Sequence, residues 1–336
     1  MSGPSMPQRV EQLKRWLRNT LGHVDFQITP ASSDASFRRY FRVVCDGQTH
    51  IVMDAPPDRE DCGPYIRIAS AFLDAGLNVP RVLDSDTQLG FLLLTDLGDR
   101  LYLDALDNQT AAPLYHDAID ALLRLQRHGA GRESFLPPYD HALLIKEMTL
   151  FGDWYLGRHL GLSLGAAQQR TLDGAYDFLA ASALEQPQVW VHRDYHSRNL
   201  MVTGTNNPGV LDFQDAVTGP VTYDLVSLLR DCYIAWPRDA IERWVENYFD
   251  RAQAAGLLDG VQFTALLRWF DLMGVQRHLK ATGIFSRLNH RDGKPGYLRD
   301  IPRTLGYVLD VSGRFPELAE LRKFLDTAVV PRLTAF

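Results

Sequence analysis

The first part of the chain combines one amphipathic helix with several short hydrophobic runs. Near the start, hydrophobic side chains recur at helical spacing: Val10, Leu13, Leu17 and Leu21. This spacing predicts a helix over 8–21. Three β-type runs follow at 26–29, 38–44 and 49–55, separated by clusters of small and polar turn residues. The pattern predicts three strands connected in meander order.

One more helix and two more strands are expected before residue 100. Hydrophobic spacing over 62–76 predicts a helix that ends at Gly76, and strands are expected at 81–84 and 90–97. The first hundred residues therefore predict a small five-stranded antiparallel sheet with a helix inserted after the third strand.

After Gly98 the hydrophobic pattern becomes helical over long stretches, interrupted by one β-rich passage at 189–212. Helices are expected over 100–128, 140–160, 166–184, 222–233, 238–255, 261–284, 297–311 and 316–330. We therefore expect an α+β fold with two lobes, residues 1–97 and residues 98–336, of which the second is larger and mainly helical. A chain of 336 residues is long enough for two such lobes.

Composition and charge exclude several classes of protein. Hydrophobic residues make up 46% of the chain and charged residues 23%, which is typical of a globular protein with a sizeable core. The net charge of −6 argues against a general nucleic-acid-binding protein. Three cysteines without a CxxC pair fit a cytoplasmic location, and no hydrophobic run is long enough to cross a membrane. The pattern indicates no obligate protein partner.

Most of the candidate chemistry lies in the passage Val189–Asp215. A short hydrophobic run leads into His192-Arg193-Asp194, and Asn199 comes five residues after Asp194. Two further short runs flank a turn and end at Asp212-Phe213, 13 residues after Asn199. An HxD sequence alone arises readily by chance, but HxDxxxxN followed by DF at this spacing is far more specific.

These residue types suit phosphoryl transfer, which needs a divalent cation on the phosphates and a positioned acceptor oxygen. Magnesium prefers hard oxygen ligands and takes few of them from the protein. An Asn and an Asp at the ends of neighbouring short strands can share one cation. We therefore expect Asn199 and Asp212 to bind Mg²⁺ and Asp194 to act as the catalytic base. His192 is expected to brace the loop by hydrogen bonding.

His192 and His196 have the spacing of two zinc ligands on one helix. The residue after His192 is Arg193, where a zinc hydrolase of this type needs Glu, and the flanking residues predict a loop. A metal-hydrolase site is therefore disfavoured, and His196 is expected at the edge of the site.

The same residues resemble the aminoglycoside phosphotransferase and choline kinase family, whose catalytic loop has the pattern HxDxxxxN followed by an acidic residue that opens a D-[FW] motif. The resemblance covers nearly the whole chain, because the sheet, the inserted helix and the helical second lobe come in that family's order. It implies a two-lobed protein-kinase-like fold and the cofactors ATP and Mg²⁺. Gly219–Leu225 fits a later G-x-x-x-x-D-L element, in which Asp224 would have a structural role.

Four longer phrases resemble one branch of this family, whose members phosphorylate sugars recovered from the bacterial cell wall. They are SSDASFRRYFRV, IVMDAPP, HRDYHSRNLM and LDFQDAVTGPVTYDLVSLLRDCY. The resemblance implies N-acetylmuramate and N-acetylglucosamine as acceptors, phosphorylated by ATP on the anomeric C1 hydroxyl group. The sugar 1-phosphates would serve peptidoglycan recycling towards UDP-sugars.

The chain departs from the family pattern on the nucleotide side. The turn at 31–37 has no glycine, so Ser33, Ser36 and backbone N–H groups would have to hold the phosphates. Met53-Asp54 stands where the family usually has Lys or Arg, and Tyr65 lies near the position of its Glu partner. The usual anchor for the triphosphate is therefore in doubt.

Three arginines on the preceding strand could supply the missing positive charge: Arg38, Arg39 and Arg42. A solvated strand face is slightly favoured for any single one of them, and we take Arg39 as the candidate nucleotide ligand. Adenine is expected along the end of the fifth strand, which leads into the hinge. There, Leu94, Asp96 and Leu97 would present backbone groups irrespective of their side chains.

The acceptor is expected in the helical lobe. Residues 261–300 contain seven Lys and Arg against three Asp, which favours an anionic acceptor over a polycationic antibiotic. Arg277, His278 and Lys280 are the candidates for a shared binding patch. A solvated basic helix face would show the same pattern and is the more common situation for any one residue.

Other possible substrate contacts have open roles. Asp215 can either reach the sugar or form hydrogen bonds with amide groups of the loop, and the sequence favours neither role. Arg198 can face the transferred phosphate or pair with a carboxylate. Three aromatic residues could stack on a sugar ring, although aromatic residues more often belong to a core: Tyr233, Trp236 and Trp269.

Two other functions remain open. One is a kinase for a different small alcohol, such as an antibiotic, choline or an amino sugar at another position. The other is a nucleotide-binding pseudokinase, suggested by the missing Lys, although a degenerate site usually loses Asp194, Asn199 and Asp212. A protein kinase lacks support because Gly219 comes only seven residues after Asp212, which leaves little room for an activation loop.

Overall fold

The structure is a computed structural model that describes residues 6–22, 25–33 and 37–333. It comprises two compact units, each formed by two segments of the chain. The first unit combines residues 1–100 with 200–215, and the second combines 101–199 with 216–336. The first division falls after Arg100, close to the boundary expected after Leu97. The segment 200–215, which was expected in the second lobe, packs within the first unit.

The first unit is built on an antiparallel sheet with the strand order β1-β2-β3-β5-β4. The strands are β1 (Gln27–Ser33), β2 (Arg39–Cys45), β3 (Gln48–Asp54), β4 (Val82–Asp86) and β5 (Phe91–Thr95). Helix α2 (Gly63–Asp74) follows β3, so the expected sheet with one inserted helix is confirmed. The tight turn between β2 and β3 is made by Asp46 and Gly47, both of which have positive φ.

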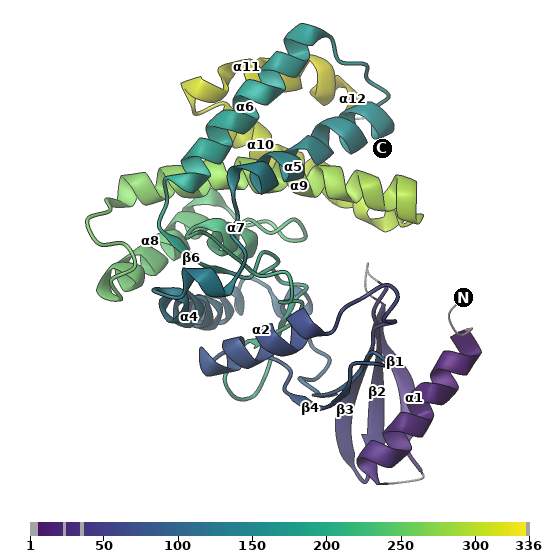
Figure 1. Cartoon of the computed structure of the whole chain (residues 1–336). Helices are drawn as coiled ribbons and strands as arrows, with labels where there is room; N and C mark the ends of the chain where they lie inside the picture. Colours follow the sequence, from purple (N-terminus) through teal and green to yellow (C-terminus); the bar gives the residue numbers. More distant parts are fainter. Residues whose placement is uncertain (1–5, 23–24, 34–36, 334–336) are drawn as a thin grey trace. The chain divides into compact units, whose positions relative to one another are not determined.

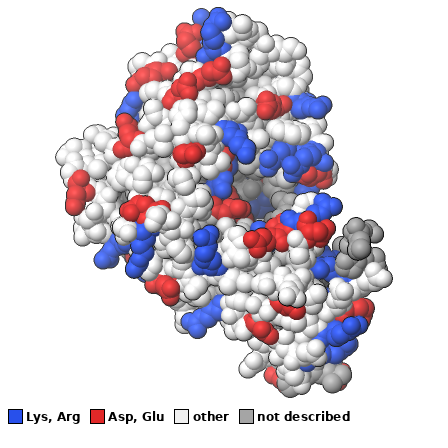
Figure 2. Space-filling view, viewed as in Figure 1, with Lys and Arg blue, Asp and Glu red and all other residues white. Residues whose placement is uncertain are grey.

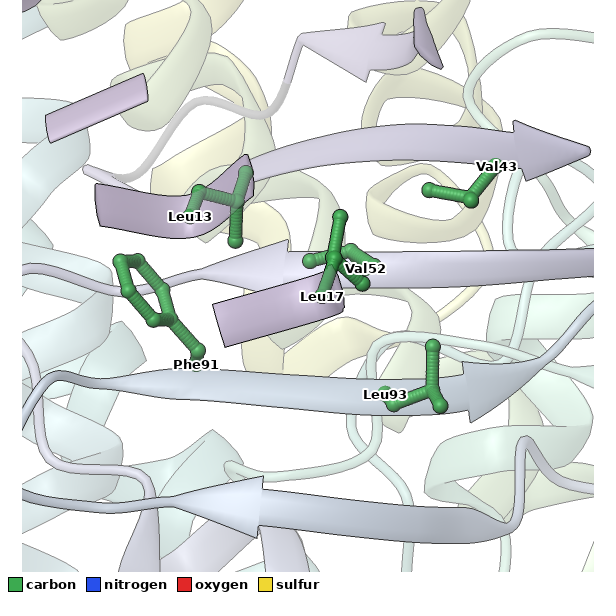
Figure 3. Packing of buried hydrophobic residues seen from close by; sticks show 6 residues of the cluster. All are labelled: Leu13, Leu17, Val43, Val52, Phe91 and Leu93. Carbon is green, nitrogen blue, oxygen red and sulfur yellow. The ribbon is translucent and has the colours of Figure 1, made fainter. Parts of the chain in front are cut away.

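Helix α1 (Met6–Leu21) covers one face of this sheet (Figure 1). Its side chains Leu13 and Leu17, one turn apart, are fully buried. The sheet contributes the other members of the cluster, which Figure 3 shows from close by: Val43, Val52, Phe91 and Leu93. Burying one side chain of this size contributes about 1.5–3 kcal/mol, so this cluster accounts for much of the attachment of the helix to the sheet.

Residues 200–215 complete the first unit. They form the strand pair β7 (Leu200–Met201) and β8 (Gly209–Val210). The N–H group of Val210 donates to the carbonyl oxygen of Asn78 over 2.7 Å. Phe213 is fully buried, and its ring centre lies 4.8 Å from that of Tyr65 and 5.7 Å from that of Phe72 on α2. The DF motif is thus anchored on α2 by aromatic packing.

The second unit is mainly helical, and α9 (Phe263–Asp292) is its central helix. Helix α9, light green in Figure 1, packs against α5, α6 and α10. The other α-helices and the strands are α3 (Tyr102–Ala105), α4 (Ala111–Gly129), α5 (His141–Leu150), α6 (Ala166–Leu184), α7 (Tyr223–Leu229), α8 (Arg238–Ala254), α10 (Ile301–Ser312), α11 (Ala319–Phe324), α12 (Val330–Leu333), β6 (Gln188–Val191) and β9 (Val217–Pro220). Short 3-10 and π-helical segments are η1 (Glu133–Phe135), η2 (Phe151–His159), η3 (Pro295–Asp300), η4 (Pro316–Leu318) and η5 (Leu325–Val329).

Helix α9 approaches the end of α5 very closely at Gly283. A Cβ atom at this position would lie 2.3 Å from the carbonyl carbon of Leu150, so the packing requires glycine. The close approach allows side chains of α9 to meet side chains of α5 in the interior of the unit.

Some helix boundaries differ from the sequence predictions for local reasons. The helix expected over 100–128 is interrupted before α4, because the Asp107 carboxylate accepts hydrogen bonds from the N–H groups of Gln109 and Thr110. The helix expected over 140–160 starts as α5 and continues as the π-helix η2. Helix α9 does not end at residue 284 but runs on to Gly293, whose φ of 65° terminates it.

Charges of both signs are mixed on the surface. Figure 2 shows Lys and Arg side by side with Asp and Glu over the face in view, in keeping with the modest net charge of −6. Within the described ranges, no helix combines the length and the apolar character that a membrane span requires.

Candidate active site

The HxDxxxxN motif lies on the loop that follows β6. This strand pairs with β9, and both are largely buried, so the loop starts from a rigid base. The fully buried His192 ring accepts a hydrogen bond at Nδ1 from the N–H group of Asp194 over 3.2 Å. The side-chain amide of Asn199 donates to the backbone carbonyl oxygen of Asp194 over 3.0 Å. The backbone N–H group of Asn199 donates to the backbone carbonyl oxygen of His196 over 2.9 Å. These bonds draw residues 194–199 into one compact turn.

Asp224, in the first turn of α7, fastens the start of the loop. Its carboxylate oxygens accept hydrogen bonds from the N–H groups of His192, over 2.6 Å, and Arg193, over 3.0 Å. Burial raises the pKa of Asp224 to about 7, although the two N–H groups act in the opposite direction. Arg193 has a φ of 78°, which residues other than glycine rarely adopt, so these bonds stabilise a strained backbone.

Asp194 is partly exposed and lies in a positive electrostatic field. Burial alone would raise the pKa of its carboxyl group, but Lys280 and then His196, Arg277 and Arg193 outweigh burial and lower it. The carboxylate is therefore ionised at neutral pH and can accept a hydrogen bond, and then a proton, from a bound hydroxyl group.

Buried Glu147, on α5, holds two of these cations in place. Its carboxylate lies 3.0 Å from the ammonium nitrogen of Lys280 and also pairs with the guanidinium group of Arg193. The hydroxyl group of Tyr139 donates to the same carboxylate, and Lys280 donates to the hydroxyl oxygen of Tyr223 over 2.9 Å. Glu147 therefore links α9 to the candidate catalytic loop.

Glu147 is absent from the sequence-based predictions, although a signal was present. Leu144, Glu147, Met148 and Phe151 lie at positions i, i+3, i+4 and i+7 and share one buried helix face. A carboxylate on an otherwise apolar face needs a cationic partner, since a buried charge is costly unless it is paired.

The three basic residues expected to form a patch on α9 have different surroundings. Arg277 and Lys280 are both buried and both act on the loop carboxylate. His278 is fully buried, with its Nε2 2.8 Å from the carbonyl oxygen of Arg230 and its ring stacked on Tyr307 at 4.7 Å. Burial lowers the pKa of His278 to about 3, so its ring is neutral. The structure thus brings Arg277 and Lys280 to the loop and gives His278 a place in the packing between helices.

The aromatic candidates also separate into two groups. Tyr233 lies beside the loop, with its ring edge-on to His196 at 5.4 Å. Trp236 donates a hydrogen bond to the hydroxyl oxygen of Tyr115 over 2.7 Å, and Trp269 donates to a surface carboxylate. Tyr233 is therefore the aromatic candidate that the structure places at the loop.

In the first unit, Asp212 follows β8 and has a φ of 62°. Its carboxylate accepts a hydrogen bond from the side-chain amide of Gln214 over 2.7 Å, and Asp215 is exposed three residues further on. The carboxylate of Asp212 and the amide oxygen of Asn199 are donors of the kind that magnesium prefers, so these residues fit such an ion. Among the described residues, no three His, Cys, Asp or Glu side chains form a metal-binding group. Magnesium bound to nucleotide phosphates usually needs only one or two side chains.

Arg39, the expected nucleotide ligand, is engaged elsewhere. The fully buried carboxylate of Asp54 accepts hydrogen bonds from Arg39 Nε over 3.1 Å and from Arg9 Nε over 2.6 Å. Arg42 pairs in the same way with Asp96 at 2.7 Å. Both strand arginines therefore have a carboxylate partner within the first unit.

Arg38 lies in a different environment, beside the DF motif. It pairs with Glu60 at 3.1 Å, and both side chains are largely buried. Burial alone would lower the pKa of the Arg38 guanidinium, but neighbouring acidic groups raise it. In order of effect these are Tyr40, Glu60, Asp215 and Asp212. Arg38 is thus the strand arginine whose charge acts at the candidate metal ligand.

The other residues expected to contact the nucleotide are two serines near the end of β1 and three residues in or after β5. Ser36 lies outside the described residues, and Ser33 is the last residue of β1. Leu94 is inside the sheet and pairs with strands on both sides, so its backbone groups face those strands. Asp96 and Leu97 follow the end of β5 and lie outside this strand pairing.

The HxDxxxxN loop, the DF motif and the five-stranded sheet with one inserted helix are each features of a kinase-type phosphotransferase. Residues 27–263 match the model of the phosphotransferase enzyme family, and the chain therefore belongs to this family. The expected enzyme class, a phosphotransferase, is confirmed.

Individual relatives are similar over nearly their whole length. The N-acetylmuramate/N-acetylglucosamine kinase of Pseudomonas putida is 49% identical over 332 residues, which cover 96% of this chain and 97% of that one. The kinase of the same name from Pseudomonas aeruginosa is 47% identical, covering 94% and 96%. An ADP-bound aminoglycoside phosphotransferase has a TM-score of 0.56 at 14% identity, covering 91% of this chain and 99% of its own. The expected protein-kinase-like fold is confirmed.

Proposed function

We propose that this protein transfers the γ-phosphoryl group of ATP to the anomeric C1 hydroxyl group of N-acetylmuramate and N-acetylglucosamine. The single observation that carries the proposal is the compact hydrogen-bonded loop that holds Asp194 and Asn199, with the positive charges of Lys280, Arg277 and Arg193 acting on the Asp194 carboxylate. The names of the relatives supply the two acceptors. The products would be the sugar 1-phosphates.

In the proposed reaction, the carboxylate of Asp194 accepts a hydrogen bond from the C1 hydroxyl group. As the bond between O1 and the γ-phosphorus forms, the proton passes to Asp194 and the bond from that phosphorus to the bridging oxygen breaks, which releases ADP. An anomeric hydroxyl group is more acidic than an ordinary alcohol. A carboxylate with a lowered pKa is therefore a sufficient base.

On the nucleotide side, we assign Asn199 and Asp212 as ligands of Mg²⁺, which would neutralise charge on the phosphates. Arg38, held by Glu60, replaces Arg39 as the proposed phosphate ligand because Asp212 and Asp215 act on its charge, whereas Arg39 pairs with Asp54. Asp96 and Leu97 are the proposed backbone contacts to adenine.

On the acceptor side, the proposed contacts are Arg277, Lys280, Arg198 and Asp215. The first two are cations next to the proposed base, which suits an acceptor that carries a negative charge. Because ATP is the proposed donor, we assign the reaction to the cytoplasm. There, sugar 1-phosphates would be precursors of UDP-sugars in peptidoglycan recycling.

The direct test is a reaction of purified protein with ATP, Mg²⁺ and each sugar, with the position of the phosphate determined by NMR. We expect a product whose anomeric proton couples to phosphorus. Formation of a 6-phosphate would refute the proposed regiochemistry, and binding of ATP without turnover on any sugar would favour a pseudokinase.

A kinase for another small alcohol is the second candidate, favoured by the fold that the chain shares with an aminoglycoside phosphotransferase. A panel of acceptors that includes aminoglycosides, choline and other amino sugars distinguishes the two. The proposed function requires the highest kcat/KM for the two N-acetylated sugars, and a higher value for an aminoglycoside would overturn it.

A further inference from the structure

Arg198, on the candidate catalytic loop, is held between two aromatic rings. Its guanidinium carbon lies 4.5 Å from the ring centre of Tyr233 and 5.5 Å from that of Tyr297. A guanidinium group that lies over aromatic faces keeps its N–H groups directed outward in its own plane. Tyr233 also accepts a side-chain hydrogen bond from Arg198, so the two tyrosines orient the planar group and engage only part of its five N–H donors.

The two tyrosines are themselves fixed by buried residues. Tyr297 stacks on Phe285 at 5.7 Å, and Tyr233 lies 6.1 Å from the same ring, which is almost fully buried on α9. The buried carboxylate of Asp231 accepts hydrogen bonds from the N–H groups of Tyr233 and Ser197, each over 2.9 Å. We call Tyr233 and Tyr297 the clamp of Arg198. The Asp231 carboxylate thus fixes both Tyr233, which forms one wall of this clamp, and Ser197, the loop residue before Arg198.

The charge of Arg198 has no carboxylate partner among the residues that the structure describes. Other arginines of the second unit form ion pairs: Arg193 with Glu147, Arg230 with Asp271 and Arg303 with Asp300. Asp300 is the acidic group that acts on Arg198 electrostatically, but it pairs with Arg303 at 2.9 Å. The clamped guanidinium group is therefore available for an external anion.

Arg198 also lies on the same compact turn as the proposed base. The turn is closed by the hydrogen bonds from Asn199 and His196 to the carbonyl oxygen of Asp194, each 3.0 Å long. The His196 ring packs against Tyr233, which forms one wall of the clamp. Arg198 therefore belongs to the same hydrogen-bonded loop as the proposed base, four residues after it.

The two proposed acceptors differ chemically at one position. N-acetylmuramate carries a lactyl ether, with a carboxylate, where N-acetylglucosamine has a hydroxyl group. We propose that Arg198, clamped between Tyr233 and Tyr297, binds this carboxylate through paired charge-assisted hydrogen bonds and makes the site favour the lactyl-bearing sugar. This inference rests on the proposed function, since it concerns the acceptor of that reaction.

The first test compares steady-state kinetics of the native protein, Arg198→Met and a control, Arg127→Met, with both sugars. Arg127 is an exposed arginine in the last turn of α4. We expect the KM for N-acetylmuramate to rise about 10- to 100-fold in Arg198→Met, with kcat little changed, because a charge-assisted hydrogen bond is lost. The KM for N-acetylglucosamine should stay within about threefold in all three proteins.

The second test removes the charge from the ligand. With the native protein, the KM for the methyl ester of N-acetylmuramate should be raised. The increase should match the one that Arg198→Met shows for the free acid. The variant should no longer distinguish acid from ester. Arg198→Lys, which keeps the charge but not the planar fork, should give an intermediate KM for the acid, and its melting temperature checks that the loop is intact.

The outcomes separate this inference from the proposed function. If the native protein phosphorylates neither sugar, the proposed function fails and the inference fails with it. If the native protein phosphorylates both and Arg198→Met leaves the ratio of the two kcat/KM values unchanged, the inference alone is refuted. An equal loss with both sugars would assign Arg198 to the transferred phosphate or to the fold of the loop.

Discussion

The ammonium group of Lys280 and the carboxylate of Glu147 form a buried ion pair of 3.0 Å between α9 and α5. The same carboxylate holds Arg193, the residue before the proposed base, and both cations lower the pKa of Asp194. This pair therefore links the packing of α9 against α5 to the charge state of the loop.

Replacement of Glu147 by Gln should destabilise the protein strongly. The change leaves the charges of Lys280 and Arg193 buried without their anionic partner, which typically costs about 3–5 kcal/mol. Urea denaturation measures the loss of unfolding free energy. Glu11→Gln is the control, because Glu11 pairs with Lys14 at the surface and its loss should have no measurable effect. Equal stability of the two variants would show that the buried pair makes no net contribution.

Replacement of Asp194 by Asn should abolish most of the catalytic activity while ATP still binds. Removal of a general base lowers kcat by about 10²- to 10⁴-fold, and calorimetry would measure the affinity for ATP. Asp153→Asn, at an exposed position in η2, serves as the control. Retention of most of the kcat in Asp194→Asn would exclude Asp194 as the base.

The pH profile should respond to the cation beside the base. Because the pKa of Asp194 is lowered from 3.8, its carboxylate stays ionised down to acidic pH, and this group should cause no fall in kcat/KM between pH 8 and about pH 5. Lys280→Met removes a neighbouring positive charge and so raises that pKa, which moves the acidic limb of kcat/KM to higher pH. An unchanged position of the limb would contradict the assignment.

The Arg38–Glu60 pair should govern nucleotide affinity. In Arg38→Met, we expect the KM for ATP to rise about 10- to 100-fold through loss of a charged contact, with the KM for the sugar unchanged. Glu60→Gln, which loosens the arginine, should give a smaller change in the same direction. Arg67→Met, at an exposed position on α2, is the control. An effect confined to the KM for the sugar would argue against a role at the phosphates.

The secondary structure could be predicted well because hydrophobic spacing marks most elements directly. Helix α6 has the bounds that the spacing over 166–184 predicts, and the five strands appear in the expected order. The end of α9 was placed too early, at residue 284, next to Gly283. That glycine is required by the approach of α5, a tertiary contact that no local pattern reveals.

The candidate site was only partly predictable. Asp194, Asn199 and Asp212 belong to short motifs whose spacing carries the chemistry, so the sequence alone can indicate them. Glu147 comes from a helix 47 residues before Asp194, and only the packing of α5 against α9 brings it to the loop. The helical spacing can mark Glu147 as a buried carboxylate, but it does not reveal which distant cations pair with it.

The pairing of Arg39 with Asp54 could have been predicted from the hairpin of β2 and β3. With Asp46-Gly47 as a two-residue turn, Cys45 pairs with Gln48, and counting back along both strands places Arg39 opposite Asp54. A cross-strand Arg–Asp pair is a common stabilising contact. The strand register therefore decides between Arg38 and Arg39 as the proposed phosphate ligand. This register can be derived from the sequence, because the Asp46-Gly47 turn sets it.

The interleaved course of the chain bears on how this protein matures on the ribosome. Residues 101–199 are synthesised before the segment 200–215 that the first unit needs. Until then the nascent chain has no Phe213 to cover Tyr65 and Phe72 on α2. A fragment that stops at Arg100 would therefore display an unfinished aromatic surface. The first unit can complete its folding only after residue 215, when most of the polypeptide has been translated.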